Sequence, residues 1–107
     1  MFKSGGKILF LALAASLAHA ETWTGTLVDV MCKGRDLASH TTHCALACAK
    51  GGFGLVLADG KFVKFNESGN AKALALLKAT NKEKDLKAKV SGTLDRETIR
   101  VESIELQ

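Results

Sequence analysis

The chain has 107 residues, a formal net charge of +4 and three cysteines. This length is enough for one small domain after an N-terminal extension. Lysine-rich residues 81–89 are interleaved with Glu83 and Asp85, so they predict a solvated turn rather than a basic binding surface. Few aromatic residues are present to stack on bases. Composition therefore argues against a nucleic-acid partner.

Residues 1–20 have the three-part pattern of a secretory signal peptide. Two lysines make the start positive, residues 8–17 are apolar, and residues 18–20 (Ala-His-Ala) form a small-x-small cleavage signature. The apolar run is too short to cross a bilayer, which needs about 20 residues. We therefore expect an exported domain of residues 21–107, periplasmic or secreted, with no membrane span after cleavage.

The first half of this domain predicts a strand, a short helix and a β-hairpin. Residues 23–30 alternate and are rich in Thr and Val, as in a strand. Residues 42–50 predict a short helix. Residues 53–58 and 61–65 predict two strands, because Asp59-Gly60 between them is a strong hairpin signal.

The second half predicts a helix followed by a second hairpin. Ala and Leu dominate residues 71–80, which predicts a helix, and residues 66–70 supply candidate N-caps. Residues 86–94 and 98–106 predict the last two strands. The apolar phase of the last strand changes at Ser103, which predicts a β-bulge there.

The order of these elements predicts the fold class. We expect a mainly β domain with two short helices: a small five-stranded barrel like the oligonucleotide/oligosaccharide-binding (OB) fold, with a helix inserted between strands 1 and 2. In that fold the connection between strands 1 and 2 borders the usual ligand face. We expect the protein to be a monomer.

The chain also resembles a loose group of short exported bacterial proteins, mostly uncharacterised. The matching residues are "DVMC" (29–32), "HTTHCALAC" (40–48), Gly51-Gly52, and "VSGT" with "TIRVESI" in the last hairpin. The resemblance implies a signal peptide, an OB-like strand set and an inserted Cys/His helix, but no particular activity. Many of these proteins place Gly directly after the first Cys, whereas this chain has Lys33 and then Gly34.

The first interpretation of the Cys/His segment is a disulfide. Export favours oxidation, and a bond from Cys32 to Cys44 or Cys48 would tie the short helix to the first strand. Closing the loop between Cys32 and Cys48, about 16 residues, would add roughly 3 kcal/mol. A Cys44–Cys48 bond is less favourable, because side chains one helical turn apart do not converge as a disulfide requires.

The second interpretation is a metal site. Three thiolates and one imidazole suit zinc, and thiolates in an export compartment also suit Cu(I). Asp29, three residues before Cys32, can act as a ligand or as a hydrogen-bond partner of one. No C-x2-C pair is present, and the spacing matches no established zinc finger. The candidate metal ligands are Cys32, Cys44, Cys48, His40 and His43.

The third interpretation is thiol chemistry. A reactive cysteine needs an environment that favours the thiolate, such as a helix N-terminus or a nearby cation. Cys44 lies in the first turn of the predicted helix, beside His43. The absence of a C-x-x-C motif argues against a thioredoxin-like centre.

These observations favour a non-enzymatic exported module that binds a protein or a small ligand and is stabilised by one disulfide. The alternative is a periplasmic protein that binds zinc or copper through the Cys/His cluster. A thiol-redox protein is the third possibility. The sequence contains no Ser/His/Asp set, phosphate-binding loop or carboxylate pair in a catalytic context, so it favours a non-enzymatic role over an enzymatic one.

Overall fold

A computed structural model describes residues 20–34 and 36–107. The predicted signal peptide, except for Ala20, lies outside the described residues. Among the described helices, none is long and apolar enough to span a membrane. The elements in chain order are β1 (Glu21–Asp29), the 3-10 helices η1 (Val30–Cys32) and η2 (Leu37–Ser39), α2 (Thr42–Ala47), η3 (Ala49–Gly51), β2 (Phe53–Val56), β3 (Phe62–Phe65), α3 (Glu67–Ala79), β4 (Lys87–Asp95) and β5 (Thr98–Leu106).

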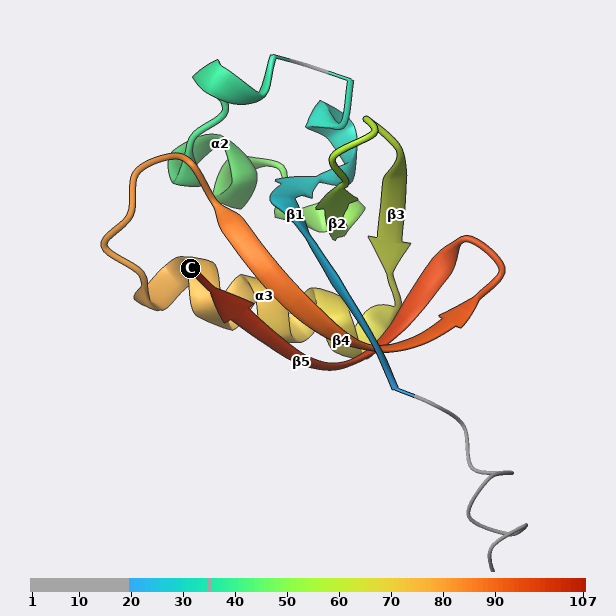
Figure 1. The fold of residues 1–107 in the computed structure, drawn as a ribbon. Coiled ribbons are helices and arrows are strands. Elements are labelled where there is room, and N and C mark those ends of the chain that lie inside the picture. The colour runs from blue at the N-terminus through green and yellow to red at the C-terminus, as the bar shows by residue number, and fades with distance from the viewer. Residues whose placement is uncertain (1–19, 35) are drawn as a thin grey trace, which may run out of the picture.

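The five strands form one sheet that closes on itself in the order β1-β2-β3-β5-β4 (Figure 1). β1 pairs with both β2 and β4, and all pairs are antiparallel except β3 with β5. Leu55 faces Val63 in the first hairpin, and Leu94 faces Ile99 in the second. The predicted mainly β fold, both hairpins and the helix between the first two strands are confirmed.

The second hairpin contains the irregularity that the sequence predicted. Ser91 pairs with Ser103, whereas the next residue, Gly92, pairs with Val101. Glu102 is therefore an extra residue on β5, and the inward-facing positions of the strand change phase across it. This confirms the break in alternation near Ser103.

Helix α3 begins four residues before the predicted start at residue 71. Asn66 is the N-cap, and its side-chain oxygen accepts hydrogen bonds from the backbone N–H groups of Gly69 (3.0 Å) and Val101 (3.1 Å). Gly69 packs closely on β5, because a Cβ built there would lie 2.5 Å from Val101 Cγ2. The helix start is thus set by one side chain that also holds a strand.

Helix α2 is shorter than the predicted helix over 42–50. Thr41 caps it by accepting a hydrogen bond from the backbone N–H of Cys44 (3.1 Å). After Cys48 the chain tightens into η3 and ends at Gly52, which has φ 90° and ψ −178°. Residues with a side chain rarely adopt this backbone conformation, so the glycine allows the turn into β2.

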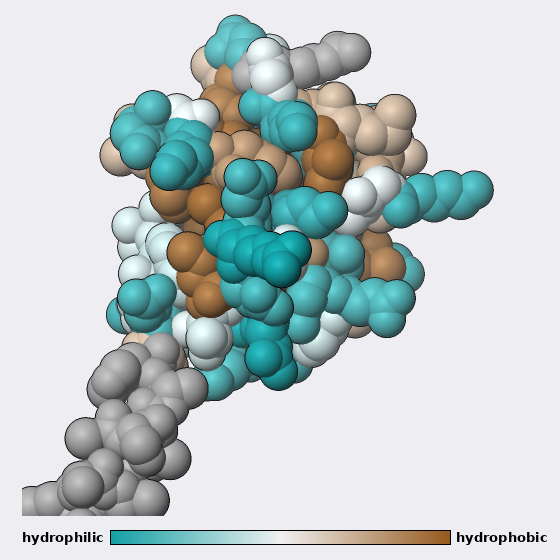
Figure 2. Space-filling view, turned by 90° about the vertical axis from the view of Figure 1, so that its right-hand side faces the viewer, coloured by the Kyte–Doolittle hydropathy of each residue, from teal (hydrophilic) through white to brown (hydrophobic). Residues whose placement is uncertain are grey.

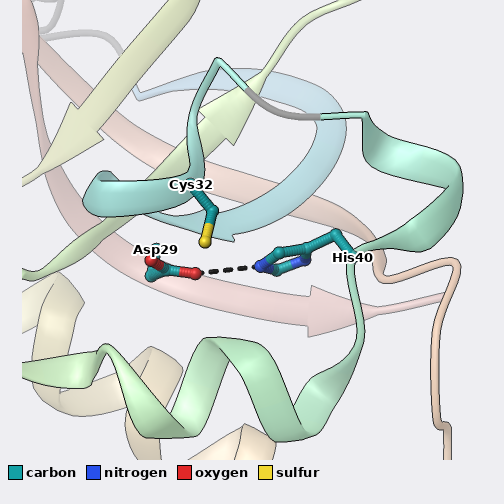
Figure 3. A group of neighbouring side chains, drawn as sticks. All are labelled: Asp29, Cys32 and His40. Carbon is teal, nitrogen blue, oxygen red and sulfur yellow. Dashed lines mark hydrogen bonds and ion pairs between the residues drawn. The ribbon is translucent and has the colours of Figure 1, made fainter.

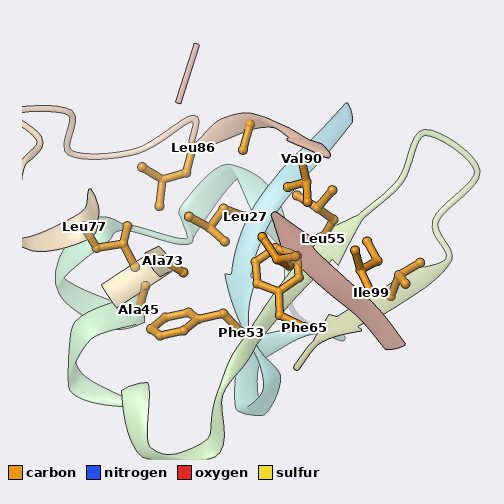
Figure 4. Packing of buried hydrophobic residues seen from close by; sticks show 13 residues of the cluster. Leu27, Ala45, Phe53, Leu55, Phe65, Ala73, Leu77, Leu86, Val90 and Ile99 are labelled. Atoms are coloured by element: carbon orange, nitrogen blue, oxygen red, sulfur yellow. The ribbon is translucent and has the colours of Figure 1, made fainter. Parts of the chain in front are cut away.

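The core lies inside the closed sheet and between the sheet and helix α3 (Figure 4). It is apolar throughout, and α2 contributes Ala45 to it. On the face shown in Figure 2, hydrophilic side chains lie between small hydrophobic areas. The large hydrophobic side chains exposed among the described residues are Met31 and Leu94. The buried cluster consists of Leu27, Ala45, Phe53, Leu55, Val63, Phe65, Ala73, Leu77, Leu86, Ala88, Val90, Ile99 and Val101.

Candidate metal centre

The connection between β1 and β2 brings together three side chains with metal-binding atoms. One donor atom each from Asp29, Cys32 and His40 lies within 4.8 Å of the other two. Figure 3 shows the Cys32 sulfur pointing toward the hydrogen bond that joins Asp29 to His40. We call these three residues the Asp29–Cys32–His40 group.

Asp29 and Cys32 are placed by the end of β1 and a single 3-10 turn. Asp29 is the last residue of β1, where it pairs with Phe53, and Cys32 ends η1. Asp29 is the extended N-cap of η1 and Cys32 is its last residue, so this single turn brings the thiol back to within 4.8 Å of the carboxylate. The Val30 backbone N–H donates to the Gly52 carbonyl (2.8 Å) and holds the turn against the start of β2.

His40 is placed by the junction of η2 and α2. It is the C-cap of η2, and its backbone N–H donates to the Leu37 carbonyl (3.2 Å). The start of η2 is capped by the Asp36 side chain, which accepts from the Ala38 backbone N–H (3.0 Å). The imidazole is thus carried by a short segment with its own capping hydrogen bonds.

The residues that follow His40 are fastened to the segment before β4. The Thr42 backbone N–H donates to the Glu83 carbonyl (2.8 Å), and the Thr42 hydroxyl donates to the Lys82 carbonyl (2.7 Å). Thr41 forms an isolated antiparallel bridge with Lys84. His40 is therefore positioned by contacts with a segment 40 residues away in sequence.

The Asp29–His40 contact is buried. His40 Nε2 lies 2.9 Å from Asp29 Oδ1, and the two side chains are 3% and 0% exposed. Asp29 Oδ2 and His40 Nδ1 are also buried, and neither has a hydrogen-bond partner among the described residues. Burying polar atoms without partners is costly, and a buried carboxylate requires a compensating charge or donor. A cation among these atoms would supply that compensation.

The other predicted ligands lie outside this group. His43 is exposed on α2, Cys44 is half-buried in the same helix, and Cys48 is half-buried at its C-cap. The structure thus brings together two of the five predicted ligands, Cys32 and His40, and joins Asp29 to them.

The predicted disulfide from Cys32 to Cys44 or Cys48 is not formed, since the described residues contain no disulfide. The physical reason is the direction of the Cys32 side chain, which η1 turns toward the carboxylate and the imidazole (Figure 3). The Asp29–His40 hydrogen bond, rather than a disulfide, joins the loop to the first strand.

Asp29 is the residue whose importance sequence reasoning understated. The sequence feature that pointed to Asp29 was its position at the end of a strand with alternating apolar residues, three residues before Cys32. That spacing places the two side chains together only if the strand is followed by a 3-10 turn. The local sequence did not predict such a turn.

Comparisons with protein-family models, with curated proteins and with solved structures found no match to this chain.

Proposed function

We propose that this protein is a small, monomeric, non-enzymatic module that binds one transition-metal ion through Asp29, Cys32 and His40. The observation that carries this proposal is the convergence of an oxygen, a sulfur and a nitrogen donor within 4.8 Å. The two buried polar atoms without partners, Asp29 Oδ2 and His40 Nδ1, support it. An ion in the group would offset the cost of burying the carboxylate.

The mixture of donors favours zinc over copper. Zn²⁺ is a borderline ion that accepts thiolate, imidazole and carboxylate ligands. Cu(I) prefers thiolates and thioethers, so the buried Asp29 carboxylate is a poor ligand for it. Zn²⁺ is therefore the ion that we propose, and Cu(I) is the competitor to be tested beside it.

The spacing of the Asp29 and His40 donor atoms fits a tetrahedral ion after a small movement. Two ligands that each lie about 2.0–2.1 Å from Zn²⁺ are about 3.3 Å apart in a tetrahedron. The His40 Nε2 and Asp29 Oδ1 atoms are 2.9 Å apart, so they need to separate by only a few tenths of an ångström. Loss of their hydrogen bond would be replaced by two bonds to the ion.

A nucleophilic Cys–His–Asp relay is the alternative use of the same residues. Such a relay bonds the nucleophile to one ring nitrogen of the histidine and the carboxylate to the other. In this structure Asp29 takes Nε2, while Nδ1 has no partner among the described residues. The Cys32 sulfur points toward the Asp29–His40 hydrogen bond (Figure 3). All three donors thus converge on one point, which favours an ion.

The fold and the N-terminal pattern indicate where in the molecule, and in which compartment, the ion would be bound. The strand order β1-β2-β3-β5-β4, with α3 between β3 and β4, supports an OB-like barrel. The pattern of residues 1–20 supports export to the periplasm or to the medium. We propose that the ion is bound there, in the connection between β1 and β2.

The proposal is tested by titrating Zn²⁺ or Cu(I) into the reduced protein in competition with a chromophoric chelator. Asp29→Asn, Cys32→Ser and His40→Gln should each weaken Zn²⁺ binding by more than the roughly 10- to 100-fold that loss of an outer hydrogen-bond partner costs. The matched controls are His43→Gln and Cys48→Ser, which alter the same segment outside the group and should leave affinity unchanged.

Two results would overturn this assignment. If the control variants weaken binding as much as the three group variants do, the ligands are those of α2. If the wild type binds neither ion while circular dichroism shows it folded, the Asp29–His40 pair is purely a structural tie between β1 and the following loop.

A further inference from the structure

We propose that the bound ion keeps one coordination position for a neutral nitrogen donor from outside the chain, an imidazole, which enters from the Cys32 side. This inference rests on the proposed function and specifies the partner chemistry of the same site. Three features of the described residues carry it: the number of donors, their burial, and their summed charge.

The number of donors leaves one position of a tetrahedral ion to be filled. In structural sites the protein supplies all four ligands of Zn²⁺, whereas in catalytic sites it supplies three and the fourth position holds an exchangeable ligand. Among the described residues the group has three members. The three candidates that could have closed the shell, His43, Cys44 and Cys48, are not among them.

The burial of the donors defines the side of entry. Asp29 and His40 are buried, whereas Cys32 is half-buried and lies between exposed Met31 and Lys33. The Lys33 ammonium group lies over the Phe62 ring of β3, 5.4 Å from the centroid. An outside ligand therefore meets the ion beside the sulfur rather than beside the carboxylate.

The charge of the group selects a neutral ligand. A divalent ion with the Asp29 carboxylate, the Cys32 thiolate and a neutral His40 imidazole has a net charge of zero. A further anion would place uncompensated negative charge beside a fully buried carboxylate, which is costly in a poorly solvated site. An imidazole nitrogen displaces a bound water without changing the charge: one metal–oxygen bond breaks and one metal–nitrogen bond forms. A histidine side chain of a partner protein has this chemistry.

The experiment uses Co²⁺ as a spectroscopic substitute for Zn²⁺ in the reduced full chain, with free imidazole as the probe. A sulfur-to-cobalt charge-transfer band, absent in Cys32→Ser, would show that the ion sits on Cys32. Imidazole is then added in increments. We expect the visible cobalt bands to shift and to saturate at one imidazole per ion, while the charge-transfer band persists because the ion has not been removed.

Each other outcome is decisive. A charge-transfer band with visible bands that imidazole does not move would overturn the open position and leave the proposed function standing. A visible spectrum that changes in His43→Ala, Cys44→Ala or Cys48→Ala before imidazole is added would identify the residue that closes the shell, and would also overturn it. Absence of the charge-transfer band in the folded wild type would remove the proposed function and this inference together.

Discussion

His40 and Asp29 are 11 residues apart in sequence, yet their side chains form a buried hydrogen bond of 2.9 Å that joins the end of β1 to the loop before α2. The energetic role of this bond can be measured separately from metal binding by unfolding the protein in the presence of a chelator. Its neighbour Cys32 completes the group without interrupting the bond.

The first prediction concerns the strength of this bond in the metal-free protein. Asp29→Ala and His40→Ala each leave a buried partner unsatisfied, so each should lower the free energy of unfolding by about 1–3 kcal/mol. The double variant should lose less than the sum, with a coupling energy of about 0.5–3 kcal/mol. Urea unfolding in the presence of a chelator measures all four proteins. Additive losses would show that the two side chains do not stabilise one another.

The second prediction concerns the effect of zinc on thermal unfolding. At a free zinc concentration of 100 Kd, binding should stabilise the folded state by about 2.7 kcal/mol. For a domain of this size each kcal/mol raises Tm by about 4–8 °C, so Tm should rise by roughly 10–20 °C. A chelator should reverse the rise, and Cys32→Ser should abolish most of it. A zinc-dependent rise of the same size in Cys32→Ser would remove Cys32 from the ligand set.

The third prediction concerns Asn66, whose side-chain oxygen accepts hydrogen bonds from the start of α3 and from β5. Asn66→Ala removes both bonds and should cost about 2 kcal/mol, the upper end of the range for an N-cap. Asn66→Asp keeps the acceptor and should cost much less. Chemical denaturation of the three proteins tests this, and equal losses in both variants would show that the acceptor is not what matters.

The fourth prediction concerns the packing of α3 on the sheet at Gly69. A Cβ at this position would meet Val101 Cγ2 at 2.5 Å and Phe65 Cβ at 2.8 Å. Gly69→Ala should therefore destabilise the protein by about 1–3 kcal/mol, although alanine is the better helix former. Ser68→Ala, at the exposed neighbouring position, is the matched control and should be neutral or slightly stabilising. A gain in stability for Gly69→Ala would contradict the close packing.

The sequence by itself determined the strands, the order of the elements and the two hairpins. Alternation of apolar residues is a local property, and Asp59-Gly60 has the residue types that a tight turn requires. The bulge beside Ser103 was also predicted from the sequence, because an extra residue in a strand changes which positions carry the inward-facing apolar residues. The candidate metal ligands were predicted from the clustering of three cysteines and two histidines between residues 32 and 48.

Only the tertiary structure decided which of those residues meet. Sequence spacing made Cys44 and Cys48 look like partners of Cys32, because the direction of the Cys32 side chain could not be read from the sequence. The 3-10 turn of η1 points it instead toward Asp29. His40 reaches the same point because Thr42 is bonded to Lys82 and Glu83, which lie far along the chain. Side-chain convergence depends on such long-range backbone contacts, and a local pattern does not contain them.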